Sequence, residues 1–182
     1  MNSKMIPVAV INPDAPAESL EAKQPAIDNG AEIYGKDGYF STEQMQREWD
    51  KVWTECWLIA GVSTDLQARG DYFLFRVRSE SIIVTQTEEG VKAFYNVCPH
   101  RGARLLTEER GNKKIFICPF HSWSFRNNGE LRTITDEETF QEPVICHRPG
   151  LTPVACEEHA GLIFVSMSDT PPPLKEAIGL PE

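Results

Sequence analysis

The spacing of hydrophobic residues divides the chain into one helical stretch followed by a series of short strands. Between positions 45 and 56, apolar residues recur at intervals of three and four, as on one face of a helix. These residues are Met45, Trp49, Val52, Trp53 and Cys56. Ser41 followed by Gln44 is a capping-box signal for a helix start. The pattern predicts a helix of about three turns, anchored on a sheet by its two tryptophans.

After position 57 the pattern changes to short apolar runs separated by turn residues. The runs that we predict as strands are 57–61, 71–77, 81–85, 91–96, 114–117, 122–125 and 161–166. The sequence Asn127-Asn128-Gly129-Glu130 predicts a hairpin turn, because Asn and Gly tolerate a positive φ. Many short strands with regular turns predict a mainly β fold, an antiparallel β-sandwich or small barrels with an N-terminal helix.

The two ends of the chain differ from this central part. Residues 1–38 lack periodicity, contain four prolines, and are predicted to form an N-terminal arm. Residues 169–182 contain three consecutive prolines, which are stiff and cannot continue a sheet. We therefore expect an arm (1–38), one β domain (39–168) and a linker (169–182) toward a further domain.

Composition excludes several classes of protein. The chain has 182 residues, of which 41% are hydrophobic and 25% are charged, values that are ordinary for a globular domain. No apolar run approaches the ~20 residues of a membrane helix. The segment Met1 to Pro7 is not followed by the apolar core of a signal peptide, which predicts a cytoplasmic protein. The net charge of -9 argues against nucleic acid as a partner.

Two short segments combine sulfur with imidazole. Cys98 and His100 lie in the first, Cys118 and His121 lie in the second, and each cysteine is followed by proline. Seventeen residues separate His100 from Cys118, enough for a strand or two between two loops that clasp one centre. Two thiolates and two imidazoles are the ligands of a Rieske [2Fe-2S] cluster, in which two His replace two Cys on one iron.

Zinc is the alternative metal, because Cys2His2 sites are common structural zinc sites. The one-residue gap between Cys98 and His100 is unusual for such a site, so the sequence favours the iron–sulfur cluster. A second set of donors, Cys146-His147 and Cys156 with His159, is interpreted as structural. We expect Cys56, Cys146 and Cys156 to be buried, reduced thiols.

The sequences CPHRG and CPFHSW resemble the two halves of the Rieske motif. More narrowly, the chain is similar over roughly residues 40–168 to the N-terminal Rieske domain of the α subunit of ring-hydroxylating (Rieske non-haem iron) oxygenases. The resemblance implies that Cys98 and Cys118 bind one iron, while His100 and His121 bind the other. It assigns no catalytic residue to this chain.

The resemblance also implies a function, an electron relay for the hydroxylation of aromatic rings. The cluster would accept electrons from a ferredoxin or reductase and pass them to a mononuclear Fe(II) on a catalytic domain, possibly in a neighbouring subunit. His121 would be the point of electron exit. Because no site for that iron is recognised in this sequence, we expect it only on the missing domain. A stand-alone Rieske-type ferredoxin is the alternative, and a zinc-bound interaction module is a third possibility.

Two differences from Rieske proteins of the respiratory type bear on the cluster. Ala103 and Phe120 stand where that type has cysteines, so no disulfide joins the loops here. Trp123 and Phe125 stand where that type has hydroxyl groups that donate hydrogen bonds to the cluster. Fewer donors destabilise the more negative reduced cluster, so we predict a potential near the low end of the Rieske range, about -150 mV.

The segment that carries the motif is basic although the chain is acidic. Between positions 98 and 132 there are seven basic and three acidic residues. One interpretation is a collar that docks on an acidic surface near the cluster. The other is that these charges offset the charge of the cluster or keep the loops solvated. The sequence favours neither interpretation.

Overall fold

The computed structural model describes residues 35–141 and 150–179, so the predicted arm lies almost wholly outside the described residues. The chain forms two compact units, residues 1–41 and 42–182. The described part of the first unit holds the short helix α2 (Asp37–Phe40). All the other described elements lie in the second unit.

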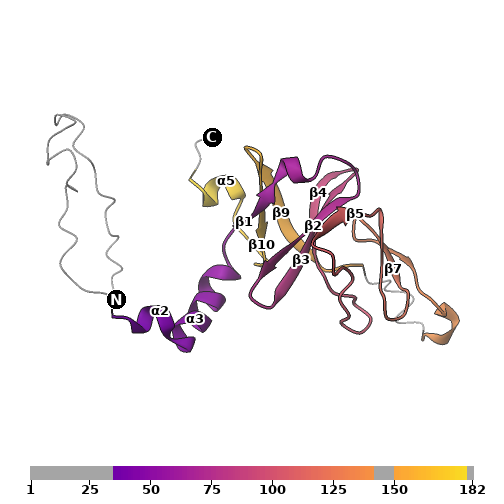
Figure 1. Ribbon diagram of the computed structural model, residues 1–182, viewed down its shortest axis with the longest axis horizontal. Helices are drawn as coiled ribbons and strands as arrows, with labels where there is room; N and C mark the ends of the chain where they lie inside the picture. Colours follow the sequence, from indigo (N-terminus) through magenta and orange to yellow (C-terminus); the bar gives the residue numbers. More distant parts are fainter. Residues whose placement is uncertain (1–34, 142–149, 180–182) are drawn as a thin grey trace. The chain divides into compact units, whose positions relative to one another are not determined.

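The second unit is built on two antiparallel sheets (Figure 1). The larger sheet is curled and has seven strands in the order β1-β10-β9-β4-β3-β2-β5. Its strands are β1 (Leu58–Val62), β2 (Asp71–Val77), β3 (Glu80–Thr87), β4 (Gly90–Tyr95), β5 (Arg110–Asn112), β9 (Pro153–His159) and β10 (Leu162–Ser166). The smaller sheet has the strands β6 (Ile115–Ile117), β7 (Ser124–Arg126) and β8 (Leu131–Thr133). The predicted mainly β, antiparallel fold is confirmed.

The central strands are almost continuously apolar because both of their faces are buried. Successive side chains of a strand point to opposite faces. On β2, Tyr72 and Leu74 belong to one core, whereas Phe73 belongs to the other. On β3, Ile83 joins the first core while Ile82 joins the second. The first core also contains side chains of the small sheet, so it holds the two sheets together.

The strongest apolar runs were predicted well, and strand 71–77 has the predicted bounds. Three strands were missed: β5, β8 and β9. The side chains of β5 are all exposed, so its sequence Arg-Gly-Asn carries no hydrophobic signal. Strand β9 begins at Pro153 and contains two glutamates, so its register with β10, not its composition, makes it a strand.

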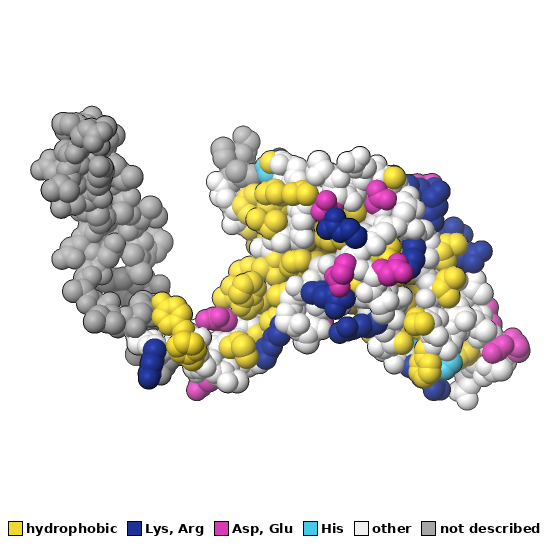
Figure 2. Space-filling model, in the orientation of Figure 1, with side chains coloured by type: hydrophobic (Ala, Val, Ile, Leu, Met, Phe, Trp, Pro, Cys, Tyr) yellow, Lys and Arg dark blue, Asp and Glu magenta, His cyan; other side chains and the backbone are white. Residues whose placement is uncertain are grey.

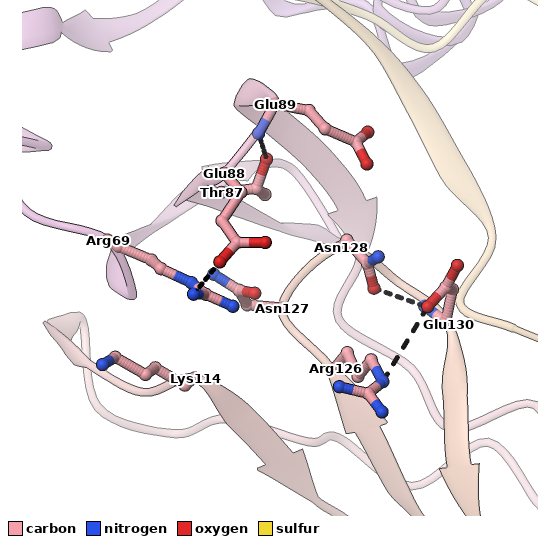
Figure 3. A pocket seen from close by; sticks show the side chains of 9 residues that line it. All are labelled: Arg69, Thr87, Glu88, Glu89, Lys114, Arg126, Asn127, Asn128 and Glu130. Carbon is pink, nitrogen blue, oxygen red and sulfur yellow. Dashed lines mark hydrogen bonds and ion pairs between the residues drawn. The ribbon is translucent and has the colours of Figure 1, made fainter.

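The predicted turn at 127–130 joins β7 to β8 (Figure 3). The N–H of Arg126 donates to the Glu130 carbonyl at 2.8 Å, and Gly129 has a φ of 89°. The Asn127 amide donates to the Gln86 carbonyl at 2.9 Å, which fastens this hairpin to the large sheet. A cavity of about 280 Å³ lies at the junction, and two ion pairs border it, Arg69–Glu88 and Arg126–Glu130.

The helix predicted before the sheet is present, but its apolar face is not buried. It consists of α3 (Thr42–Glu48) followed by the π-helical turn η1 (Trp49–Trp53). Trp53, which was predicted to anchor the helix on the sheet together with Trp49, is 42% exposed, so that prediction was wrong for Trp53. Met45 and Val52, on the same predicted face, are 48% and 45% exposed. Apolar side chains accordingly gather on the surface over α3 and η1 (Figure 2). At η1 the hydrogen bonds change from i+4 to i+5, so residues spaced for an α-helix no longer share one face.

Tryptophans fasten both this helix and the predicted linker to the sheet. The Arg78 guanidinium lies over the Trp49 ring, 5.1 Å from its centroid. The Trp57 indole donates to the Pro172 carbonyl at 2.8 Å. The short helix α5 (Leu174–Ala177) follows, and Leu174 is buried. Across residues 35–141 and 150–179, no helix has the length and apolar character needed to cross a membrane.

Candidate metal centre

The two cysteine loops are built in the same way. In each loop the cysteine N–H donates to the carbonyl five residues on, and the N–H four residues on donates back to the cysteine carbonyl. These bonds are Cys98 to Ala103 (2.8 Å), Gly102 to Cys98 (2.9 Å), Cys118 to Trp123 (2.8 Å) and Ser122 to Cys118 (3.0 Å). In both loops the residue four positions after the cysteine has a positive φ, 73° at Gly102 and 59° at Ser122. The loops therefore form two matching halves of one site.

The structure brings the predicted ligands together as two pairs. The thiols of Cys98 and Cys118 are neighbours, and each cysteine is buried in the core shared by the two sheets. The rings of His100 and His121 lie 4.7 Å apart, and both residues are half-buried. In the described part of the chain, no three His, Cys, Asp or Glu side chains are grouped as they would be around a single ion.

Each imidazole keeps one ring nitrogen away from solvent. Nδ1 of His100 and Nδ1 of His121 are buried and have no hydrogen-bond partner among the described residues. Buried polar atoms without partners are rare because each one costs ~1–3 kcal/mol. Two buried nitrogens beside two buried thiols form a donor set that fits iron in a Rieske centre. The residues present therefore fit such a cluster.

The environment shifts the pKa values of two of these groups. Burial raises the pKa of the Cys98 thiol, and the neighbouring Cys118 adds to this rise. The backbone N–H groups of His100 and Arg101 act in the opposite direction because they stabilise the thiolate. Burial lowers the pKa of His100, and the nearby His121 and Arg101 side chains lower it further. His100 is therefore neutral at pH 7, the form that binds a metal.

Asn96 supports the first loop, and the sequence analysis did not single it out. Its side chain is 3% exposed and makes several hydrogen bonds. Its amide donates to Ser81 Oγ and to the Leu106 carbonyl, and its oxygen accepts from the N–H groups of Leu105 and Leu106. The chain that leaves the Cys98 loop is thereby tied to the end of β4. The only signal in the sequence was a polar residue at the end of the apolar run 91–95, two positions before Cys98.

Comparison with known proteins identifies the family. The model of the Rieske [2Fe-2S] domain family matches residues 56–147, about half of the chain. The chain belongs to this family. A Rieske domain carries a [2Fe-2S] cluster, so the predicted cofactor is confirmed. The assignment of individual ligands remains a prediction.

The relatives of this Rieske domain are oxygenase subunits. It is 30% identical to the glycine betaine monooxygenase oxygenase subunit of Chromohalobacter salexigens, over 90% of this chain and 35% of that protein. It is 34% identical to the large oxygenase component of the naphthalene 1,2-dioxygenase system of Pseudomonas aeruginosa, over 75% of this chain and 31% of that protein. The chain thus spans about a third of the length of these two relatives.

Solved structures agree with this placement. A quaternary ammonium Rieske monooxygenase, described in connection with carnitine oxidation by gut microbiota and inter-subunit electron transfer, superposes with a TM-score of 0.71. It is 27% identical in sequence, and the match covers 80% of this chain and 40% of that one. The chain is thus a Rieske domain of the kind found in Rieske oxygenase α subunits.

The remaining cysteines differ from the prediction that all three are buried. Cys56 is exposed, because it lies just past the last turn of η1, so the prediction was wrong there. Cys156 lies on β9 and is partly buried, and burial raises the pKa of its thiol to about 12. His159 ends the same strand, while Cys146 and His147 lie outside the described residues.

Proposed function

We propose that this Rieske domain binds its [2Fe-2S] cluster through Cys98 and Cys118 on one iron and through His100 and His121 on the other. The observation that carries the proposal is the pairing of two buried thiols with two buried Nδ1 atoms that have no hydrogen-bond partner in the described parts of the chain. In such a cluster each iron takes two protein ligands, so two pairs are the expected arrangement. A single zinc ion would need all four donors around one point.

The surroundings of the four side chains favour an electron relay. When bound, the cluster would take up and release one electron at a time. The core around Cys98 and Cys118 excludes water, while His100 and His121 line an open cavity of about 410 Å³. Phe120 is 62% exposed and its ring lies 4.1 Å from that of His121. An imidazole edge and an apolar side chain therefore meet at the surface where a redox partner would dock.

The electron donor in this proposal is a ferredoxin or reductase. The acceptor is a mononuclear iron on the catalytic domain of an oxygenase, in a neighbouring subunit, with His121 as the exit. The description of inter-subunit electron transfer for the quaternary ammonium relative supports this route. A stand-alone ferredoxin is the alternative. The match to an oxygenase subunit over 90% of the chain, including the helix before the sheet, favours the oxygenase component.

Hydroxylation of aromatic rings remains the proposed reaction of the whole protein. The 34% identity to the naphthalene dioxygenase component supports it. Oxidation of a quaternary ammonium compound is the second candidate, supported by the relatives named for glycine betaine and carnitine. Oxygen uptake by the oxygenase holoenzyme with naphthalene, compared with uptake with glycine betaine, distinguishes the two.

The test of the ligand set uses the full chain after anaerobic reconstitution with iron and sulfide. We expect two irons per chain and a Rieske EPR signal, with a potential near the predicted value of about -150 mV. His121→Cys should retain a cluster with a lower potential, because a charged ligand replaces a neutral one. His159→Cys on β9 is the matched control and should leave the potential unchanged. A colourless, iron-free wild type, or an unchanged potential in His121→Cys, contradicts the assignment.

A further inference from the structure

The indole N–H of Trp123 is buried and has no acceptor in the part of the chain that the structure describes. The residue is 1% exposed, and Nε1 has no hydrogen-bond partner among the described residues. Leaving such a donor unpaired costs ~1–3 kcal/mol, so an unpaired N–H in a well-packed core requires an explanation. The other indole whose bond is known, that of Trp57, donates to a backbone carbonyl.

The orphan N–H lies beside the proposed ligands. The Trp123 ring is stacked on the His100 ring, with 4.6 Å between centroids and 3° between planes. Phe140 meets both rings edge-on at 5.5 Å, which fixes the stack from a third side. The unpartnered Nδ1 atoms of His100 and His121 belong to the same site. Three buried nitrogens at one place therefore lack partners among residues 35–141 and 150–179, and one bound group can satisfy all of them.

We propose that the Trp123 indole donates a hydrogen bond to a sulfur atom of the bound cluster and thereby raises its reduction potential. This inference rests on the proposed ligand set. A neutral indole N–H donates a hydrogen bond and cannot coordinate a metal ion. Its acceptor in the cluster is therefore a sulfur atom. A hydrogen bond to sulfur stabilises the reduced cluster more than the oxidised one, because reduction adds negative charge. Trp123 is in this respect a positioning and tuning residue, not a ligand.

The experiment is a redox titration of the reconstituted full chain. Trp123→Phe keeps an aromatic ring for stacking and removes the N–H. We expect its reduction equilibrium constant to fall about tenfold, which is about 59 mV for a one-electron couple. Trp57→Phe also removes an indole N–H, but one that bonds to Pro172, and its potential should equal that of the wild type. Equal potentials in Trp123→Phe and the wild type overturn the proposal.

A second measurement, made on the wild type, tests the proposal if the Trp123→Phe protein does not fold or does not bind a cluster. In the wild type, the ultraviolet Raman band of the indole N–H should show one tryptophan gaining a hydrogen bond when the cluster is loaded. No change on loading overturns the proposal. Ser124 Oγ is also buried, and no described residue forms a hydrogen bond with it. A lowered potential in Ser124→Ala, with none in Trp123→Phe, would move the donor role to that hydroxyl and overturn the proposal too.

The two proposals fail in distinguishable ways. A wild type that binds no iron contradicts the proposed function itself. A wild type with a Rieske signal, together with a Trp123→Phe protein of unchanged potential, contradicts only the role of Trp123.

Discussion

At the scale of single residues, the site depends on buried polar atoms, some with hydrogen-bond partners among the described residues and some without. Asn96 is satisfied by Ser81 and by the chain after the first loop, whereas Trp123 Nε1 has no partner in the described residues. The four ligands could be predicted because each cysteine lies within three positions of a histidine in the sequence. Trp123 was counted in the sequence analysis only as the loss of a hydroxyl donor, and its own N–H became significant once the structure showed it buried.

Asn96→Ala should destabilise the domain by about 3 kcal/mol, because the N–H groups of Leu105 and Leu106 stay buried without an acceptor. The measurement is the midpoint of urea unfolding. Asn112→Ala is the matched control, since its amide bonds are exposed and their loss should cost less than about 1 kcal/mol. Equal losses in the two variants would mean that the Asn96 bonds contribute nothing beyond those of a surface asparagine.

At the scale of elements, local turn chemistry was predictable and burial was not. The turn at 127–130 forms as expected because Asn and Gly suit its backbone. Strand β9 could not be found from its polar sequence, because its pairing with β10 stabilises it. The apolar spacing from Met45 to Cys56 predicted a helix correctly but not its exposure, since periodicity cannot show whether a partner surface is within reach.

Gly129→Ala should destabilise the β7–β8 hairpin by more than about 2 kcal/mol. Its φ is 89°, and an added Cβ would lie 2.3 Å from Cε1 of the buried Phe94 ring. Gly90→Ala, at the first position of β4, shares the positive φ, but the added Cβ meets nothing within 4 Å. Thermal unfolding of both variants therefore separates the backbone cost from the clash. A Gly90→Ala protein as unstable as Gly129→Ala would show that the contact with Phe94 does not matter.

At the scale of the whole molecule, the basic segment stands out from an acidic chain with a net charge of -9. Some of its cations are paired on the surface, among them Arg110 with Asp65 and Lys113 with Glu108. Arg101, beside His100, forms no ion pair within the described residues and is exposed. The structure thus leaves positive charge next to the proposed cluster, which favours the docking interpretation of the collar.

Reduction of the cluster by an acidic [2Fe-2S] ferredoxin should slow as ionic strength rises, because salt screens the attraction between the two surfaces. Arg101→Glu should slow reduction several-fold at low salt. Lys175→Glu, on the exposed surface of α5, changes the net charge equally and should have no effect. Stopped-flow rates that are independent of both salt and Arg101 would support the solvation interpretation instead.

The sequence by itself determined the fold class, the family and the candidate ligands. These follow from local patterns: apolar runs bounded by turn residues, and sulfur and imidazole donors spaced within a few positions. Only the tertiary structure decided which buried nitrogens lack a partner among the described residues and which aromatic ring lies on His100. Those properties depend on segments about twenty residues apart meeting across two sheets, and no pattern within either segment specifies that meeting.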